Sequence, residues 1–125
     1  MHDVTKQNET FMTGDDLLAQ YANGRRDFSN LSMKTYLTLD DCDLRDINFT
    51  NCWLDGSFKN SNLENAIFVD ACVKTAFFNN ANLNGADFSR AMIDATEFEN
   101  AKIQSANFEG ATAYSGTYRQ GELPP

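Results

Sequence analysis

The chain has 125 residues, of which 42% are hydrophobic, and its formal net charge is −8. This length predicts a single domain with a real core, and the acidic charge disfavours nonspecific binding to nucleic acid or to an anionic membrane. The sequence has no run of eighteen apolar residues, and its polar start does not resemble a secretory signal, so we expect a cytoplasmic protein without a membrane span. Three cysteines in that setting indicate free thiols rather than a disulfide framework.

The first predicted element is a short capping helix over residues 13–24. Thr13 and Asp16 form a variant capping box at its start, and Gly24 follows its end. Its apolar stripe is Leu17, Leu18 and Tyr21. Such a helix would cover the open edge of the structure that follows. Residues 1–12, which precede it, are expected to be a disordered leader.

Beyond the helix, the sequence repeats every five residues. When the chain is cut into fives from Ser61, alanine occupies the first position in nine of eleven cells. The third positions hold Leu, Phe, Val or Ile, with one Ala at the end, and the other three positions are mostly polar. A helix needs a period of about 3.6 and a strand a period of about two, so neither fits this pattern.

Cells such as ANLNG and ADFSR, residues 81–90, resemble the consensus of the pentapeptide repeat family. The resemblance covers about residues 26–115. It implies an all-β fold, a right-handed quadrilateral parallel β-helix in which each pentapeptide makes one side and four pentapeptides make one coil. The first and third residues of each cell are then expected to point inward, and the other three to face solvent.

The repeat extends backwards to Phe28 if one residue is inserted near Tyr36 and if Ser57–Asn60 is a cell of four residues. Third positions one coil apart then sort into four ladders, two rich in phenylalanine and two aliphatic. The phenylalanine ladders are Phe28, Phe49, Phe68, Phe88 and Phe108 on one side, and Leu39, Phe58, Phe78 and Phe98 on the opposite side.

These ladders give about four and a half coils, so residues 25–115 are assigned to the solenoid. Residues 116–125 are expected to form a C-terminal cap or tail, with Tyr114 and Tyr118 lying on the last coil.

Groups for catalysis or metal binding do not converge in the sequence. The single histidine, His2, lies in the leader, and Cys42 and Cys52 occupy first positions, where a small inward residue is needed. The sequence has no Cys-x-x-Cys pair and no Gly-rich phosphate loop. We therefore expect no enzyme activity, no cofactor and no metal site.

The stretch DDCDLRD partly matches a calcium-binding loop, but it lacks the glycine and the distal glutamate of such a loop. In the repeat register its carboxylates fall on outward slots of two adjacent sides, so a solvated acidic rim is the preferred interpretation. We call these residues the acidic rim: Asp40, Asp41, Asp43 and Asp46.

Apolar side chains occupy several outward slots where the repeat consensus expects polar residues. We call them the apolar patch: Trp53, Cys72 and Met92 on one side, Ile67 and Val69 on the preceding side, and Phe77 on the next side. Tryptophan and methionine are enriched at interface centres, so the patch is a candidate partner-binding surface. Three alternatives stay open: a homodimer seam, a patch covered by the leader or a tail, and exposed apolar residues without a role.

The hypothesis that follows is a non-catalytic protein-interaction module, a regulator or immunity-type protein of the bacterial cytoplasm. It would act as a monomer or weak homodimer and contact neither nucleic acid nor membrane. The resemblance offers an alternative, because some bacterial pentapeptide repeat proteins are acidic rods that mimic duplex DNA and bind DNA gyrase. Residues 27–115 carry 13 acidic and 6 basic side chains. The fourth positions Lys34, Asp55, Lys74 and Asp94 alternate in sign, which disfavours mimicry.

Overall fold

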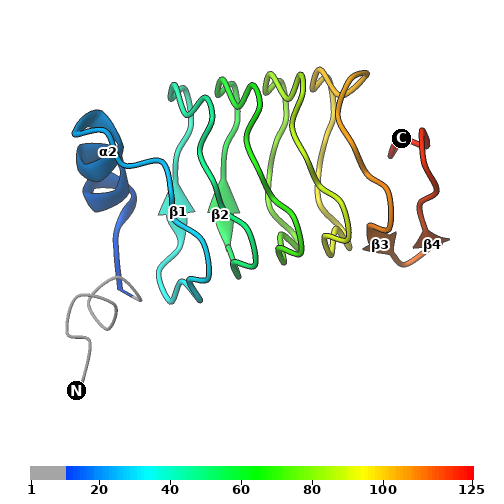
Figure 1. Cartoon of the computed structure of the whole chain (residues 1–125), viewed down its shortest axis with the longest axis horizontal. Helices are drawn as coiled ribbons and strands as arrows, with labels where there is room; N and C mark the ends of the chain where they lie inside the picture. The colour runs from blue at the N-terminus through cyan, green and yellow to red at the C-terminus, as the bar shows by residue number, and fades with distance from the viewer. Residues whose placement is uncertain (1–10) are drawn as a thin grey trace.

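A computed structural model describes residues 11–125 of the chain. Helix α2 (Gly14–Ala22) comes first and is followed by a column of stacked coils, with the C-terminus at the far end of the column (Figure 1). Four strands of two residues each are recognised along it: β1 (Leu37–Thr38), β2 (Gly56–Ser57), β3 (Thr112–Ala113) and β4 (Gly116–Thr117). No helix among residues 11–125 is long and apolar enough to cross a membrane.

Each coil is joined to the next by parallel β-bridges. Asn62, for example, pairs with Asn82, twenty residues later, so four cells of five residues complete one coil. Backbone hydrogen bonds run in both directions between coils, from Leu83 N to the Lys102 carbonyl (3.0 Å) and from Asn82 N to the Ser61 carbonyl (2.9 Å). The molecule is therefore a four-sided parallel β-solenoid whose extended stretches are very short.

Two columns of phenylalanine rings fill the core. From Phe58 and Phe68 onward the rings within a column stack nearly parallel, with centroids 4.6 Å apart for Phe68 and Phe88 and 5.0 Å apart for Phe58 and Phe78. The earlier rings of the first column are tilted, by 45° between Phe28 and Phe49. Between the columns Phe78 and Phe88 meet edge to face at 90°. Both the stacked and the edge-to-face geometries are favoured by the aromatic quadrupole. The ladder expected from the sequence is confirmed by ring contacts between successive members: Phe28, Phe49, Phe68, Phe88 and Phe108.

One coil side contains an extra residue. Ser32 pairs with Trp53 and Thr38 pairs with Ser57, so Ser32 and Thr38 are both second positions of their cells. They are six residues apart, where a regular cell would place them five apart. The insertion falls at the exposed corner occupied by Tyr36, in agreement with the sequence-based register.

The cell of four residues lies one cell earlier than predicted: it is Cys52–Asp55 and not Ser57–Asn60. Four residues of one coil here oppose five of the next, as the pairs Trp53↔Cys72 and Ser57↔Phe77 show. Gly56 consequently takes a first position and opposes Leu37 in the coil before it. A Cβ at Gly56 would lie 2.2 Å from the Leu37 carbonyl oxygen, so a side chain there would collide with that backbone.

Helix α2 covers the N-terminal end of the column (Figure 1). Its capping box is complete, because Thr13 Oγ1 accepts from Asp16 N and Asp16 Oδ2 accepts from Thr13 N, both at 3.1 Å. Leu17 is fully buried, and the Tyr21 hydroxyl donates to the Arg45 carbonyl (2.7 Å).

The expected leader overlaps the described residues only at its end. Residues 1–10 of it lie outside the part of the chain that the structure describes. Met12, which the sequence-based boundary placed in the leader, is buried in the core, and its carbonyl accepts a hydrogen bond from the Thr35 hydroxyl. The chain therefore packs on the solenoid before the helix begins.

A hairpin closes the C-terminal end. Strands β3 and β4 pair antiparallel, and the Tyr118 ring packs 6.4 Å from Phe108, the last ring of its column. The expectation that Tyr114 also lies on the last coil is wrong, because this side chain is 87% exposed. Tyr114 falls in the two-residue turn between the strands.

Candidate functional site

The apolar patch is built around three outward second positions on one side of the solenoid. Parallel bridges join Trp53 to Cys72 and Cys72 to Met92, so these side chains stand on three successive coils. Trp53 is 54% exposed, Met92 is half-buried and Cys72 is only 2% exposed. Trp53 is therefore the prominent end of the row, and Cys72 lies hidden between its neighbours.

An open hollow of about 240 Å³ lies beside Trp53. Its edge is polar: the Asn51 side-chain amide donates to Asn30 Oδ1 (3.0 Å), and Asp70 is paired with Arg90 (2.9 Å). The residues that line it are Asn30, Leu31, Ser32, Asn51, Cys52, Trp53, Asp70, Cys72 and Met92. The hollow thus combines apolar walls with a rim whose hydrogen bonds are already made.

The apolar patch is less exposed on the two neighbouring sides of the solenoid than at Trp53. Ile67 and Val69 are half-buried on the side that precedes Cys72 in the same coil. Phe77, on the next side, already has a partner, because Lys59 Nζ lies 4.8 Å from its ring centroid. Ile67 and Val69 extend the surface around Cys72, whereas Phe77 is partly covered.

Two ion pairs lie beside the patch. Lys74 Nζ lies 3.4 Å from Asp94 Oδ2 on the next coil, within the predicted ladder of alternating sign. On the neighbouring corner Arg90 spans one coil to reach Asp70. These two pairs form part of a polar border, and Asp55 is an exposed carboxylate of that border that forms no ion pair in the described part of the chain.

The acidic rim does not converge on a ligand site. Asp40 accepts hydrogen bonds from the Ser57 hydroxyl and from Lys59 N (3.0 Å), which ties it to the next coil. The Arg45 guanidinium donates to both carboxylate oxygens of Asp43, from Nε to Oδ1 at 2.9 Å and from Nη2 to Oδ2 at 2.8 Å. This hydrogen bonding lowers the pKa of Asp43. Asp41 and Asp46 occupy corners with φ of 59° and 64°. Within residues 11–125 no group of three metal-ligating side chains comes together.

The surroundings of Cys42 and Cys52 do not activate either thiol as a nucleophile. Burial raises the pKa of Cys52 to about 11, and its Sγ donates to the Phe28 carbonyl (3.0 Å). Burial also raises the pKa of Cys42, with Asp40 and Asp41 adding to the effect. Thiolate nucleophiles need the opposite shift. His2 lies outside the described residues, so its predicted role as a bystander stays a prediction.

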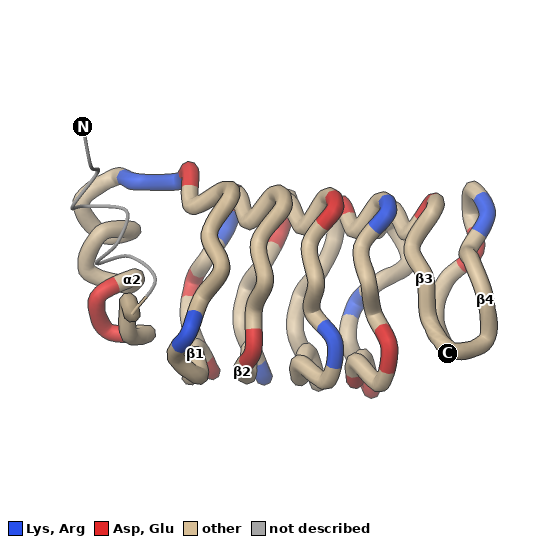
Figure 2. The backbone as a smooth tube through the Cα atoms, turned by 90° about the horizontal axis from the view of Figure 1, so that it is seen from below, with Lys and Arg blue, Asp and Glu red and all other residues tan. Residues whose placement is uncertain are grey.

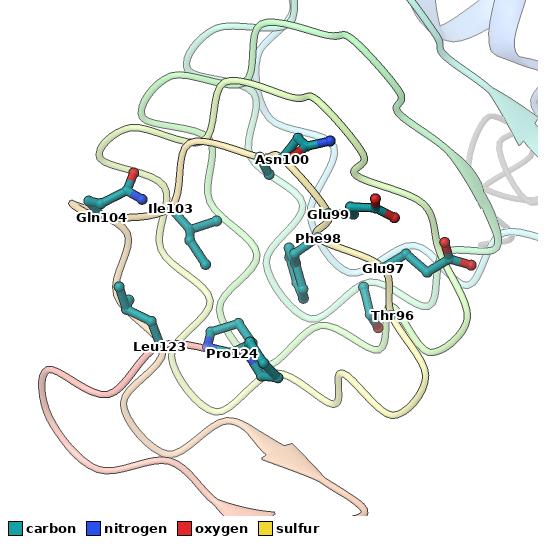
Figure 3. Close-up of a pocket in the computed structure, with 11 residues that line it drawn as sticks. Thr96, Glu97, Phe98, Glu99, Asn100, Ile103, Gln104, Leu123 and Pro124 are labelled. Atoms are coloured by element: carbon teal, nitrogen blue, oxygen red, sulfur yellow. The ribbon is translucent and has the colours of Figure 1, made fainter.

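A second hollow, of about 650 Å³, lies at the C-terminal end of the column. Phe98 and Ile103 of the last coil face it from one side, and Leu123 and Pro124 of the tail face it from the other (Figure 3). Pro124 is buried there. The tail thus folds back over the side of the last coil that has no following coil to cover it.

The sequence profile described as pentapeptide repeats, in eight copies, matches residues 42–80 and 76–110. The chain belongs to the pentapeptide repeat family. A comparison with curated proteins finds no match.

Several solved pentapeptide repeat structures are similar to this pentapeptide repeat protein. Rfr23 from the cyanobacterium Cyanothece 51142 has 22% sequence identity and a TM-score of 0.41, over 73% of this chain and 68% of that one. The protein alr5209 from Nostoc PCC 7120 has 17% identity and a TM-score of 0.44, over 91% of both chains. QnrB1, a plasmid-mediated fluoroquinolone resistance protein, has 19% identity and a TM-score of 0.32, over 76% of this chain and 53% of that one.

Sequence reasoning about this pentapeptide repeat protein identified the outward positions but not which of them are covered. Two contacts were missed: Lys59 over Phe77, and Asp40 with Ser57. Both join outward slots on successive coils of one side. The register of the repeat, with the short cell placed correctly, could have indicated both contacts.

Proposed function

We propose that this chain is a non-catalytic protein-interaction module of the bacterial cytoplasm that binds a protein partner through the apolar patch. The observation that carries the proposal is the half-exposed indole of Trp53, set in a row with Cys72 and Met92 where the repeat normally places polar residues. Tryptophan is among the side chains that most often dominate binding energy at interfaces.

The anatomy of the surface supports this proposal. Its centre is apolar, and its border includes ion pairs that are already formed, Asp70 with Arg90 and Lys74 with Asp94. A partner that covers the centre would therefore leave these four charges compensated, and a basic group of the partner could pair with the exposed Asp55. Because backbone hydrogen bonds hold each coil on both sides, the surface is rigid before binding, which lowers the entropic cost of association.

The role itself would be that of a regulator or immunity-type protein, present as a monomer or weak homodimer. Members of the pentapeptide repeat family generally serve as structural or interaction modules. Within residues 11–125, Cys52 and Cys72 are buried, Cys42 is partly buried, and no group of three His, Cys, Asp or Glu side chains comes together.

The experiment is affinity capture with the double variant Trp53→Ser, Met92→Ser. Both side chains point away from the core, so we expect a thermal unfolding midpoint close to that of the parent protein and a loss of partner capture. Tyr36→Ser is the matched control, because Tyr36 has the same 54% exposure as Trp53 but lies outside the patch.

Three results would contradict the proposal. Unfolding of the double variant would show that the patch is part of the core. Undiminished capture would place the partner elsewhere, most directly on the acidic rim. Loss of a concentration-dependent dimer, seen by sedimentation, with no partner captured by the parent would identify the patch as a homodimer seam.

The alternative function, an acidic DNA mimic that binds DNA gyrase, is favoured by the net charge of −8 but not by its distribution. Basic and acidic segments alternate along the column (Figure 2). Arg45, Lys74 and Arg90 each neutralise a neighbouring carboxylate. Duplex DNA presents about one uninterrupted negative charge per 1.7 Å, which this surface does not reproduce.

A further inference from the structure

One exposed corner of the solenoid carries the sequence Asn84–Gly85. Gly85 has φ +72°, and a Cβ there would lie 2.3 Å from Asn65 Oδ1 of the preceding coil. The positive φ favours glycine at this position, and a side chain there would require the Asn65 amide to move. Glycine also leaves its own amide nitrogen sterically open, next to the side-chain amide of Asn84.

A single hydroxyl group from the next coil contacts both reactive groups of this corner. The Gly85 N–H donates to Ser105 Oγ at 3.0 Å, and the Ser105 hydroxyl donates to Asn84 Oδ1 at 3.4 Å. The same oxygen can thus accept a proton from the amide nitrogen while its own proton stabilises negative charge on the amide oxygen. All three residues are exposed, so water can enter and ammonia can leave.

We propose that Asn84 is a site of intramolecular deamidation assisted by Ser105. The Gly85 nitrogen attacks Asn84 Cγ and forms the new N–Cγ bond, while its proton passes to Ser105 Oγ and the Ser105 proton passes to Oδ1. The Cγ–Nδ2 bond then breaks, and ammonia leaves with the proton returned from the oxygen. The resulting five-membered imide is opened by water at either carbonyl, which gives aspartate or isoaspartate at position 84. No electrons are exchanged with another molecule.

The products alter the surface and the repeat in different ways. Either one places a carboxylate close to Asn82, whose amide donates to Glu64 at 2.8 Å, and so adds a second negative charge near Glu64. Isoaspartate also routes the main chain through Cβ, which adds one backbone atom to the cell of residues 81–85. We expect this longer cell to shift Ala86 from its buried first position.

The chain contains its own matched control, the second Asn–Gly pair, Asn23–Gly24. There the Gly24 N–H donates to the Tyr21 backbone carbonyl (2.9 Å). A carbonyl can accept a hydrogen bond but has no proton to give to the asparagine oxygen. The two pairs share the Asn–Gly dipeptide and differ in the hydroxyl group and in backbone setting, because Asn23 is the C-cap residue of α2 with φ −84° and ψ 7°.

The experiment is peptide mapping by mass spectrometry after incubation of the full chain at neutral pH and physiological temperature. We expect Asn84 to convert several-fold faster than Asn23. Ser105→Ala should slow conversion at Asn84 to about the rate at Asn23, and Ser105→Thr, which keeps the hydroxyl, should retain the faster rate. Circular dichroism of each variant checks that the solenoid is intact.

Two outcomes would overturn the proposal. Conversion of Asn84 no faster than that of Asn23 in the parent protein would show that the corner is not activated. Unchanged or faster conversion in Ser105→Ala would show that the hydroxyl is a bystander or a clamp that protects the corner.

Discussion

Phe88 shows how strongly a single ring is held in the column. It is fully buried between Phe68 at 4.6 Å and Phe108 at 4.9 Å. Phe88→Ala should lower the free energy of unfolding by roughly 3–5 kcal/mol, because hydrogen-bonded coils on both sides prevent the cavity from collapsing. Urea unfolding measures this loss. Phe77→Ala, on the outside of the same solenoid, is the control, and an equal effect of both changes would contradict the expected difference.

Cys52 is expected to make the folded protein less stable at alkaline pH. Burial raises the pKa of this thiol from 9.0 to about 11, so the folded state keeps its proton while the unfolded state loses it. The stabilisation is complete below pH 9 and is lost as pH rises toward 11, by roughly 2–3 kcal/mol. Cys52→Ala, which restores the usual first-position residue, should flatten the fall in unfolding free energy over that window. An unchanged slope would show that the thiol is not responsible.

The inward residues could be predicted from the period of the repeat, whereas the burial of one outward residue, Cys72, could not. First and third positions are dictated by a core of fixed cross-section, so Ala66 and Phe68 are buried as the repeat requires. Cys72 is an outward residue, yet its neighbours in the row hide it. Its exposure depends on side chains from other coils, and a period of five residues carries no information about their sizes.

Helix α2 is the element whose contribution can be separated from the repeat. Its capping box links Thr13 and Asp16, and Leu17 anchors it in the core. Thr13→Ala should cost about 1 kcal/mol of stability, because Asp16 N loses its acceptor. The thermal unfolding midpoint measures this cost, with Thr117→Ala on exposed β4 as the control. Equal midpoints for the two variants would mean that the helix unfolds separately from the solenoid.

Element boundaries at the two ends were harder to predict than the coils. The capping box and Gly24 indicated a helix over residues 13–24, and the structure has Gly14–Ala22. The hairpin of β3 and β4 was not predicted, because the repeat register was continued through Ala113. The short cell was misplaced for a related reason: Gly56 and Ser57 are both small, and only the pairing with Leu37 shows which of them points inward.

At the scale of the whole molecule, the charge pattern decides between the two proposed functions. Because charges such as Lys74 and Asp94 are paired, the surface formed by residues 11–125 has no continuous row of negative charge along the column. We expect the purified protein at micromolar concentration to leave supercoiling by DNA gyrase unchanged, with or without a quinolone. A supercoiling assay on agarose gels tests this, and inhibition or protection at that concentration would favour the DNA-mimic function instead.

Each coil pairs only with the coils before and after it, so the height of the column can change without a change in its cross-section. Bridges join residues 19 to 21 positions apart, and the column from Ala81 onward keeps a strict step of twenty. Residues 81–100 therefore begin and end at equivalent corners, so Asn80 could be followed by Ala101 as readily as by Ala81. Height can then change by duplication or loss of one coil-length of sequence, while both end caps and every layer of the core keep their form.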